Sequence, residues 1–373
     1  MLERLQENTS VWERLKGMDK PIVLYGMGDG ALKIMAAFKK FGIPLAGIFA
    51  SDEFVRGHSF EGYPVRTFSQ TKELLGDFFI VLAFGTFREP LLSYLYQLSE
   101  NYGMAAPDVP VIPDAPLSSW CEEPGSIFDL EYIRTHENEL DQVYALLSDE
   151  LSRKTFLNVL DFKISGKLSY LKEITSPVSE VYNSIIRPRE TDDYIDLGAY
   201  TGDTVEEFLK AAGGRCSSIL AMEPDRKTFL KLKKRIEALG LTNITAINAG
   251  SYDRKGTLLF DARAGRNSSF QGETGTPVQV YSVDELLGGK PASVIKLDVE
   301  GAEEKSLMGC RNTIQNFHPR LMVSAYHRNS DLFRLPLLVH SIYPEYRVYL
   351  RHHPYIPAWE TNFYFSARNP LDK

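Results

Sequence analysis

The sequence predicts an α/β protein whose larger part is a doubly wound, mostly parallel sheet. Short apolar runs alternate with amphipathic helical segments through residues 194–325, which is the pattern of strands joined by crossover helices. Two of these runs end in an acid, Asp196 and Asp298, and a glycine follows shortly after each acid. A strand, a glycine loop and a helix also open near residue 22, which predicts a smaller α/β domain ahead of the larger one.

Composition narrows the class of protein. The chain has 373 residues, of which 43% are hydrophobic and 24% are charged, so it can bury a sizeable core. Its formal net charge is −7, which disfavours a nucleic-acid partner, because such proteins cluster Lys and Arg against phosphates. We expect no transmembrane segment, since no apolar run is long enough. The cysteines Cys121, Cys216 and Cys310 lack zinc or disulfide spacing, so we expect a reduced, cytoplasmic protein.

A first domain is expected over residues 1–118. Residues 21–25 are typical of a buried strand, and a glycine loop, a helix to Phe41 and a second strand over 45–49 follow. An acid beyond such a loop suits a contact with ribose. The candidate nucleotide-binding residues are Gly26, Gly28, Gly30 and Asp52. This Rossmann-like stretch resembles the N-terminal domains of sugar acyltransferases, which implies a nucleotide-sugar ligand. The alternative is a ligand-free domain for docking or dimerisation.

A linker separates this domain from the larger one. Residues 107–124 are rich in proline, which marks the end of the first domain. Residues 126–171 are mostly helical by pattern. We therefore expect a helical linker or cap over 119–177 and the larger domain over 178–373.

The larger domain opens with a strand that ends at Asp196. Gly198 and Gly202 allow the backbone after this strand to turn tightly and approach a ligand. A loop that binds pyrophosphate presents bare N–H groups, whereas Asp196 and Asp203 place negative charge here. This pattern favours a cofactor with positive charge and hydroxyls, such as S-adenosylmethionine. The alternative is a tight turn with a solvated aspartate.

The segments that follow extend this candidate cofactor site. Thr204 is expected to cap the next helix. The second strand ends at Glu223-Pro224, where an acid suits ribose hydroxyls. The third ends at Asn248-Ala249, which are small and polar, as a contact with the adenine edge needs.

Two later strands end in residues suited to chemistry, Asp298 and Tyr326-His327. Because the carboxyl ends of parallel strands meet at one edge of a sheet, Asp298 and His327 should project into one crevice. His327 can take a proton from a hydroxyl near neutral pH, or it only braces the loop. Lys296 is a further catalytic candidate, or half of a structural ion pair with Glu300. Asp298 and Glu300 with a histidine suit Mg²⁺ or Mn²⁺, but we predict no metal, because the sequence shows no dedicated cluster of three acids.

Six short segments, in order, connect the larger domain to a known family. They are Asp-Leu-Gly-Ala-Tyr-Thr-Gly-Asp-Thr (196–204), Glu-Pro-Asp (223–225), Asn-Ala-Gly (248–250), Ser-Val-Asp-Glu-Leu (282–286), Ile-Lys-Leu-Asp-Val-Glu-Gly-Ala-Glu (295–303) and Ser-Ala-Tyr-His (324–327). With them, residues 178–366 resemble the FkbM-type family of S-adenosylmethionine-dependent methyltransferases. Tyr200 departs from the wider superfamily, in which many members carry a glycine at that place of the loop.

The resemblance implies a Rossmann-like methyltransferase fold with an antiparallel last strand. It also implies methyl transfer to a hydroxyl of a sugar, a glycan or a small secondary metabolite. The implied cofactor contacts are Asp196, Gly198, Ala199, Tyr200, Gly202, Asp203, Thr204, Glu223, Pro224, Asn248, Ala249 and Asp298, and the candidate catalytic residues are His327, Asp298 and Lys296. The alternative is a nucleotide-sugar- or NAD-binding protein of glycan biosynthesis whose methyltransferase-like half does no chemistry.

One basic cluster lies near the end of the chain. Arg347, Arg351, His352 and His353 follow one another closely in a segment typical of a strand. We interpret this cluster as the solvated face of that strand, because charged residues in a run are usually exposed.

Overall fold

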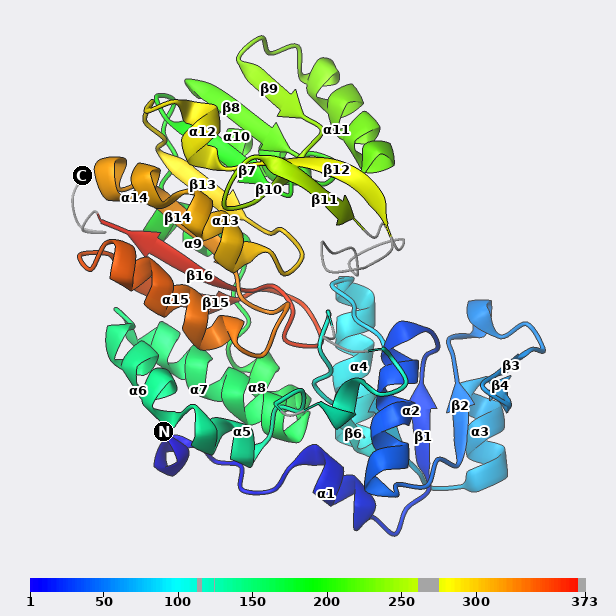
Figure 1. The fold of residues 1–373 in the computed structure, drawn as a ribbon. Coiled ribbons are helices and arrows are strands. Elements are labelled where there is room, and N and C mark those ends of the chain that lie inside the picture. Colours follow the sequence, from blue (N-terminus) through cyan, green and yellow to red (C-terminus); the bar gives the residue numbers. More distant parts are fainter. Residues whose placement is uncertain (113–115, 124, 261–274, 368–373) are drawn as a thin grey trace. The chain divides into compact units, whose positions relative to one another are not determined.

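A computed structural model describes residues 1–112, 116–123, 125–260 and 275–367 (Figure 1). The chain divides into two compact units. Unit 1 comprises Met1–Asp141, Arg153–Thr175 and His352–Glu360, and unit 2 comprises Gln142–Ser152, Ser176–Arg351 and Thr361–Lys373. Both units therefore draw on the helical region expected as a linker, and unit 1 also takes a segment from near the end of the chain.

Unit 1 contains a six-stranded sheet in the order β3-β4-β2-β1-β5-β6. All its pairings are parallel except that of β3 with β4. Its strands are β1 (Ile22–Tyr25), β2 (Gly47–Phe49), β3 (Ser59–Phe60), β4 (Tyr63–Arg66), β5 (Phe79–Leu82) and β6 (Met104–Ala105). Its helices are α1 (Val11–Lys16), α2 (Asp29–Phe41), α3 (Phe68–Leu75), α4 (Glu89–Tyr102), α5 (Leu130–Thr135) and α8 (Leu168–Lys172), with short 3₁₀ turns η1 (Leu2–Arg4), η2 (Asp52–Phe54) and η3 (Trp120–Glu122). Helices α6 (Glu137–Leu146) and α7 (Glu150–Ser165) contribute residues to both units.

The late segment His352–Glu360 pairs with the rest of unit 1 through its backbone. The N–H of Thr86 donates to the carbonyl of Ile356 (2.8 Å), and the N–H of Ile356 donates back to the carbonyl of Thr86 (3.0 Å). Tyr355 and Trp359 pack at Gly85, where an added Cβ would lie 2.9 and 2.7 Å from their rings. Unit 1 thus includes residues separated by more than two hundred positions in the sequence.

Unit 2 contains a seven-stranded sheet in the order β15-β16-β14-β13-β7-β8-β9. Strands β9, β8, β7, β13 and β14 run parallel, and β16 pairs antiparallel with β14, which confirms the predicted fold class. The strands are β7 (Asp193–Leu197), β8 (Ser218–Met222), β9 (Ile244–Ile247), β13 (Val294–Leu297), β14 (Arg320–Ser324), β15 (Arg347–His352) and β16 (Thr361–Ser366). A second sheet, in the order β10-β12-β11, consists of β10 (Gly250–Ser251), β11 (Gly256–Phe260) and β12 (Thr276–Tyr281).

Helices form a layer on each face of the seven-stranded sheet (Figure 1). One layer is α9 (Val178–Val181) with the π-helical turn η4 (Tyr182–Ile186), α10 (Asp203–Ala211) and α11 (Arg226–Leu239). Its buried side chains, among them Phe208 and Leu232, pack on Tyr194 and Ile219 of the sheet. The other layer is α12 (Val283–Leu287), α13 (Glu303–Gly309), α14 (Arg311–Phe317) and α15 (Asp331–Ile342). Among the described residues, no helix combines the length and apolar character needed to cross a membrane.

The start of α10 differs from the expectation. The helix begins at Asp203 with Gly202 as its N-cap, in a left-handed conformation (φ +88°). Thr204 is therefore inside the first turn and does not cap the helix. Its hydroxyl donates to Asp196 Oδ2 instead (2.5 Å), so it connects the helix to the end of β7.

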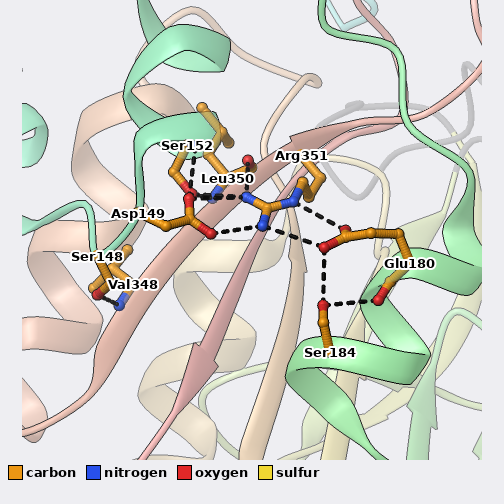
Figure 2. Close-up of polar contacts among 8 residues, drawn as sticks. All are labelled: Ser148, Asp149, Ser152, Glu180, Ser184, Val348, Leu350 and Arg351. Carbon is orange, nitrogen blue, oxygen red and sulfur yellow. Dashed lines mark hydrogen bonds and ion pairs between the residues drawn. The ribbon is translucent and has the colours of Figure 1, made fainter. Parts of the chain in front are cut away.

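The expectation of a solvated basic face on β15 is wrong, because Arg351 is buried. Its guanidinium donates to both oxygens of Asp149 (3.2 and 2.7 Å) and to Glu180 Oε2 (3.0 Å), as Figure 2 shows. It also donates to the hydroxyl of Ser152 (2.8 Å), which accepts the N–H of Leu350 (3.0 Å). One arginine therefore connects three segments of unit 2: the sheet strand, the start of α7 and helix α9.

The same segment before α7 covers the edge of the sheet. The N–H of Val348 donates to the hydroxyl of Ser148 (2.9 Å; Figure 2), and the N–H of Ser148 donates to the carbonyl of Val348 (2.8 Å). These contacts pair backbone groups that an edge strand would otherwise expose.

Replacing Arg351 should destabilise unit 2. In Arg351→Met the volume is largely kept, but Asp149 and Glu180 lose their cation. Removing one partner of a buried ion pair costs about 3–5 kcal/mol, and we expect about 3 kcal/mol because the two carboxylates are about one-third exposed. Urea denaturation measures the loss. Arg347→Met is the matched control on the exposed end of the same strand, and an equal loss in both variants would contradict this role of Arg351.

Candidate functional site

The ends of β7 and β13 meet at unusually close range. Asp298 donates its backbone N–H to the carbonyl of Leu197 (3.0 Å), which continues the parallel ladder beyond the last strand residues. A Cβ added to Gly198 would lie 1.8 Å from the carbonyl oxygen of Asp298, so only glycine fits there. The predicted cofactor loop and the predicted acceptor-side acid are therefore adjacent.

The loop after β7 is held by backbone contacts to β8. The N–H groups of Gly198 and Ala199 both donate to the carbonyl of Met222 (3.1 and 2.9 Å). Tyr200 then takes a left-handed conformation (φ +46°), which is uncommon for a residue with a side chain. Its side chain is 56% exposed. The departure from glycine at this position thus places an exposed aromatic ring on the rim of the loop.

Glu223 is a buried carboxylate beside this loop. Its Oε2 accepts the N–H of Tyr200 (3.1 Å), and its Oε1 accepts the N–H of Asp225 (2.8 Å). Burial raises the pKa of Glu223 to about 7, since the backbone hydrogen bonds only partly offset the loss of hydration. Each carboxylate oxygen has two lone pairs, so both oxygens keep capacity to accept another donor.

Asn248 connects the ends of β8 and β9. Its side-chain amide donates to the carbonyls of Glu223 (2.8 Å) and Pro224 (3.0 Å). Ala249 next to it is buried. The strand ends that the sequence assigned to one site therefore lie close together. Asp203, another predicted cofactor contact, is in the first turn of α10, and its side chain is exposed.

Asp196 is fully buried and already paired. Its Oδ2 accepts the Thr204 hydroxyl, and its Oδ1 lies 3.3 Å from Lys296 Nζ. Lys296 Nζ also donates to the carbonyl of Gly198 (3.4 Å) and lies 3.9 Å from Asp298 Oδ2. The sequence predicted a positively charged cofactor beside Asp196, whereas in the structure the positive charge next to it is Lys296 of the neighbouring strand.

His327 lies buried among carboxylates. Its Nδ1 is 3.0 Å from Glu303 Oε1, and its Nε2 is 3.3 Å from Glu300 Oε2 and 3.7 Å from Asp298 Oδ1. Burial alone would lower the pKa of His327, but Glu303 and Glu300 outweigh it and raise the pKa well above its usual value. Tyr326 donates its hydroxyl to Asp298 Oδ1 (3.0 Å). The structure therefore brings Asp298 and His327 together, as the strand ends predicted.

Sequence reasoning missed two members of this group. Glu303 opens α13 and is 1% exposed, and Asp331 opens α15 and is 4% exposed. We predicted no cluster of three acids, yet Asp298, Glu300 and Glu303 converge on His327. All three acids stand close together in the sequence, within residues 295–303, and this spacing could have indicated the cluster. Their side-chain directions do not follow a strand pattern, because β13 ends at Leu297 and a turn follows it.

Two of the three glycines in the predicted nucleotide site of unit 1, Gly26 and Gly30, are closely packed. A Cβ on Gly26 would lie 2.6 Å from the Phe84 ring, and one on Gly30 would lie 2.4 Å from the carbonyl oxygen of Ala83. Gly28 is the N-cap of α2, and Asp52 is exposed in η2. These glycines allow α2 to pack at the end of β5, and a ligand there stays a prediction.

Comparisons with known proteins bear on unit 2 above all. Residues 196–357 match the methyltransferase FkbM domain, and no curated protein matches the chain. A solved methyltransferase FkbM from Methylobacillus flagellatus is 20% identical, with a TM-score of 0.72 over 97% of this chain and 94% of that one. An rRNA methylase from Streptococcus thermophilus is 12% identical, with a TM-score of 0.35 over 52% of this chain and 97% of that one. A putative methyltransferase from Streptococcus mutans, solved in complex with SAH, is 13% identical, with a TM-score of 0.34 over 52% of this chain and 97% of that one.

The domain match covers the loop after β7, the end of β13 and the histidine that follows β14. The Methylobacillus protein shares the fold of nearly the whole chain. Residues 196–357 thus match the methyltransferase FkbM domain, and the chain as a whole has the fold of a solved methyltransferase FkbM.

Proposed function

We propose that this protein is an S-adenosylmethionine-dependent O-methyltransferase that acts on a hydroxyl of a sugar, a glycan or a small secondary metabolite. The observation that carries the proposal is Glu223, a buried carboxylate tied to the loop after β7 and still able to accept two hydroxyl donors. A ribose diol is such a pair of donors. Pyrophosphate would meet repulsion from this acid.

The cofactor side is proposed to consist of the loop and strand ends around Glu223. Gly198, Ala199 and Gly202 allow the backbone to approach the ligand, and Tyr200 offers an exposed ring beside it. Asp196 stabilises this loop through its hydrogen bonds with Thr204 and Lys296, and it does not contact the cofactor itself. S-adenosylmethionine, when bound, supplies a methyl group on a positively charged sulfur.

The acceptor side is proposed to be the end of β13 and β14. Asp298 is partly exposed, lies beside Gly198, and is oriented by the Tyr326 hydroxyl. A hydroxyl that becomes a nucleophile must lose its proton, and His327 in its unprotonated form is the proposed base, with the neighbouring carboxylates stabilising the imidazolium that forms. Positioning of the acceptor in line with the methyl group supplies much of the rate.

Glu223→Gln should weaken cofactor binding and remove its pH dependence. The ionised carboxylate accepts ribose hydroxyls, and its pKa of about 7 means that wild-type affinity should rise as pH goes from 6 to 8. Losing charged hydrogen bonds costs roughly 1–3 kcal/mol, or about 5- to 150-fold in affinity at pH 8. Calorimetric titration with S-adenosylmethionine at several pH values measures both effects.

A stability measurement serves as a second readout for Glu223. In the folded protein the pKa of Glu223 lies above the ordinary value of about 4.3. The protonated Glu223 therefore contributes to the free energy of unfolding at low pH, and this contribution is lost as pH rises towards about 7. The stability of wild type relative to Glu223→Gln should therefore fall over that window. Glu237→Gln, on the exposed face of α11, should change neither readout. Equal affinity and equal pH slopes in Glu223→Gln and wild type would rule out the ribose contact.

His327→Gln should slow methyl transfer and largely keep cofactor affinity. The amide retains a polar side chain but cannot take up a proton, so we expect a loss of roughly 10²–10⁴ in single-turnover rate. The melting temperature of the same variant separates chemistry from a bracing role, because His327 is buried among charges. A variant that melts much earlier but turns over normally would leave His327 as a structural residue.

A further inference from the structure

The group around His327 brings several carboxylates close to one imidazole, and the charge of Arg328 acts on one of them, Asp331. Asp298, Glu300 and Glu303 approach its ring, and Asp331 is buried at the start of α15 close to the same group. Lys296 Nζ lies 3.9 Å from Asp298 but closer, 3.3 Å, to Asp196, so its charge is shared. One imidazole thus stands against several carboxylates, and buried carboxylates are costly unless a cation accompanies them.

Glu303 provides a second, independent observation. It is 1% exposed, and its Oε1 accepts the N–H of Val299 (2.9 Å) and faces His327 Nδ1. Its Oε2 is buried and has no hydrogen-bond partner within the part of the chain that the structure describes. A buried carboxylate oxygen without a donor is unusual in a folded protein, and it is the atom type that a metal ion takes as a ligand.

The geometry points to a metal ligand set. Asp298, Glu303 and His327 each offer one oxygen or nitrogen, and these three atoms lie within 4.8 Å of one another. We propose that Asp298, Glu303 and His327 bind one divalent cation of the Mn²⁺ type, with Glu300 beside them.

The mixed donor set selects the kind of ion. Carboxylates suit Mg²⁺, Ca²⁺ and Mn²⁺, whereas imidazole suits the transition metals, so two acids with one histidine favour Mn²⁺ over Mg²⁺. The site lies at the acceptor side of the crevice, because Asp298 adjoins Gly198 of the cofactor loop. A cation there would take the place of His327 as the group that favours loss of the acceptor's proton, because an imidazole nitrogen that binds a metal cannot also accept a proton; this use rests on the proposed function. The binding of the ion does not depend on that function.

Mn²⁺ alone tests the site in the full-length protein. Binding removes the electron paramagnetic resonance signal of free Mn²⁺, and titration without cofactor or acceptor gives the affinity and the stoichiometry. We expect one ion per chain in wild type, with Mg²⁺ competing more weakly. Glu303→Gln should lower the affinity roughly tenfold or more, because it replaces a charged ligand by a neutral one.

Glu304→Gln is the matched control, since the neighbouring residue is exposed and pairs with Arg334 on the surface. Asp298→Asn is a second variant at a less buried position and covers the case in which Glu303→Gln does not fold. Stoichiometric binding in wild type and in Glu304→Gln, with a loss in Asp298→Asn or Glu303→Gln, supports the site. Absence of stoichiometric binding in wild type, or equal affinity in every folded variant, overturns it.

The proposed function is tested separately by the cofactor titrations. Because the Mn²⁺ titration contains no S-adenosylmethionine, a negative result leaves the ribose contact of Glu223 untouched. Likewise, a protein that binds Mn²⁺ but no S-adenosylmethionine would retain the metal site and lose the methyltransferase proposal.

Discussion

The candidate site depends on one close backbone approach, that of Gly198 to the carbonyl of Asp298. Neighbouring parallel strands lie about 4.8 Å apart, and the chains that leave them usually diverge. Here the chains that leave β7 and β13 stay in contact for one more residue. A Cβ at position 198 would collide with the carbonyl of Asp298 and abolish this contact. The loop that we assign to the cofactor and the acid that we assign to the acceptor are therefore held at a fixed separation by backbone atoms, which are stiffer than side chains.

Three groups of buried charge in unit 2 are balanced differently. Arg351 meets two carboxylates that are each about one-third exposed, so water shares in stabilising them. Lys296 meets Asp196, which is fully buried, and Asp298, which is not. His327 meets three carboxylates, and Glu303 and Glu300 raise its pKa well above the usual value for an imidazole. Carboxylates thus outnumber cations most clearly at the ends of β13 and β14, which is the edge where ligands of open α/β sheets bind.

The sequence predicted the parts of this fold that depend on local pattern. Strands β8 and β13 lie at the expected residues, since each is a short apolar run ended by an acid. It did not predict the burial of Arg351, because its partners Asp149 and Glu180 stand about 200 and 170 residues away and no local pattern reports them. Thr204 was misassigned because Gly202, in a left-handed conformation, is the N-cap, so that α10 starts two residues earlier than predicted.

In the candidate site, too, strand order predicted some residue positions and not others. Asp298 and His327 could be brought together from strand order alone, since both end neighbouring parallel strands. Glu300 and Glu303 could not be placed, because the turn after β13 contains a left-handed Glu300 (φ +51°) that reverses the strand alternation. The two glutamates then reach the same histidine from different elements.

The discontinuity of unit 1 has a consequence for biosynthesis. Its segment His352–Glu360 pairs with Thr86, so the ribosome must synthesise nearly the entire chain before unit 1 has all of its backbone partners. Unit 2 likewise waits for β16, which is made after that segment. Unit 1 therefore cannot complete its native pairing before most of unit 2 has been translated, and the two units should reach their final structures close together in time.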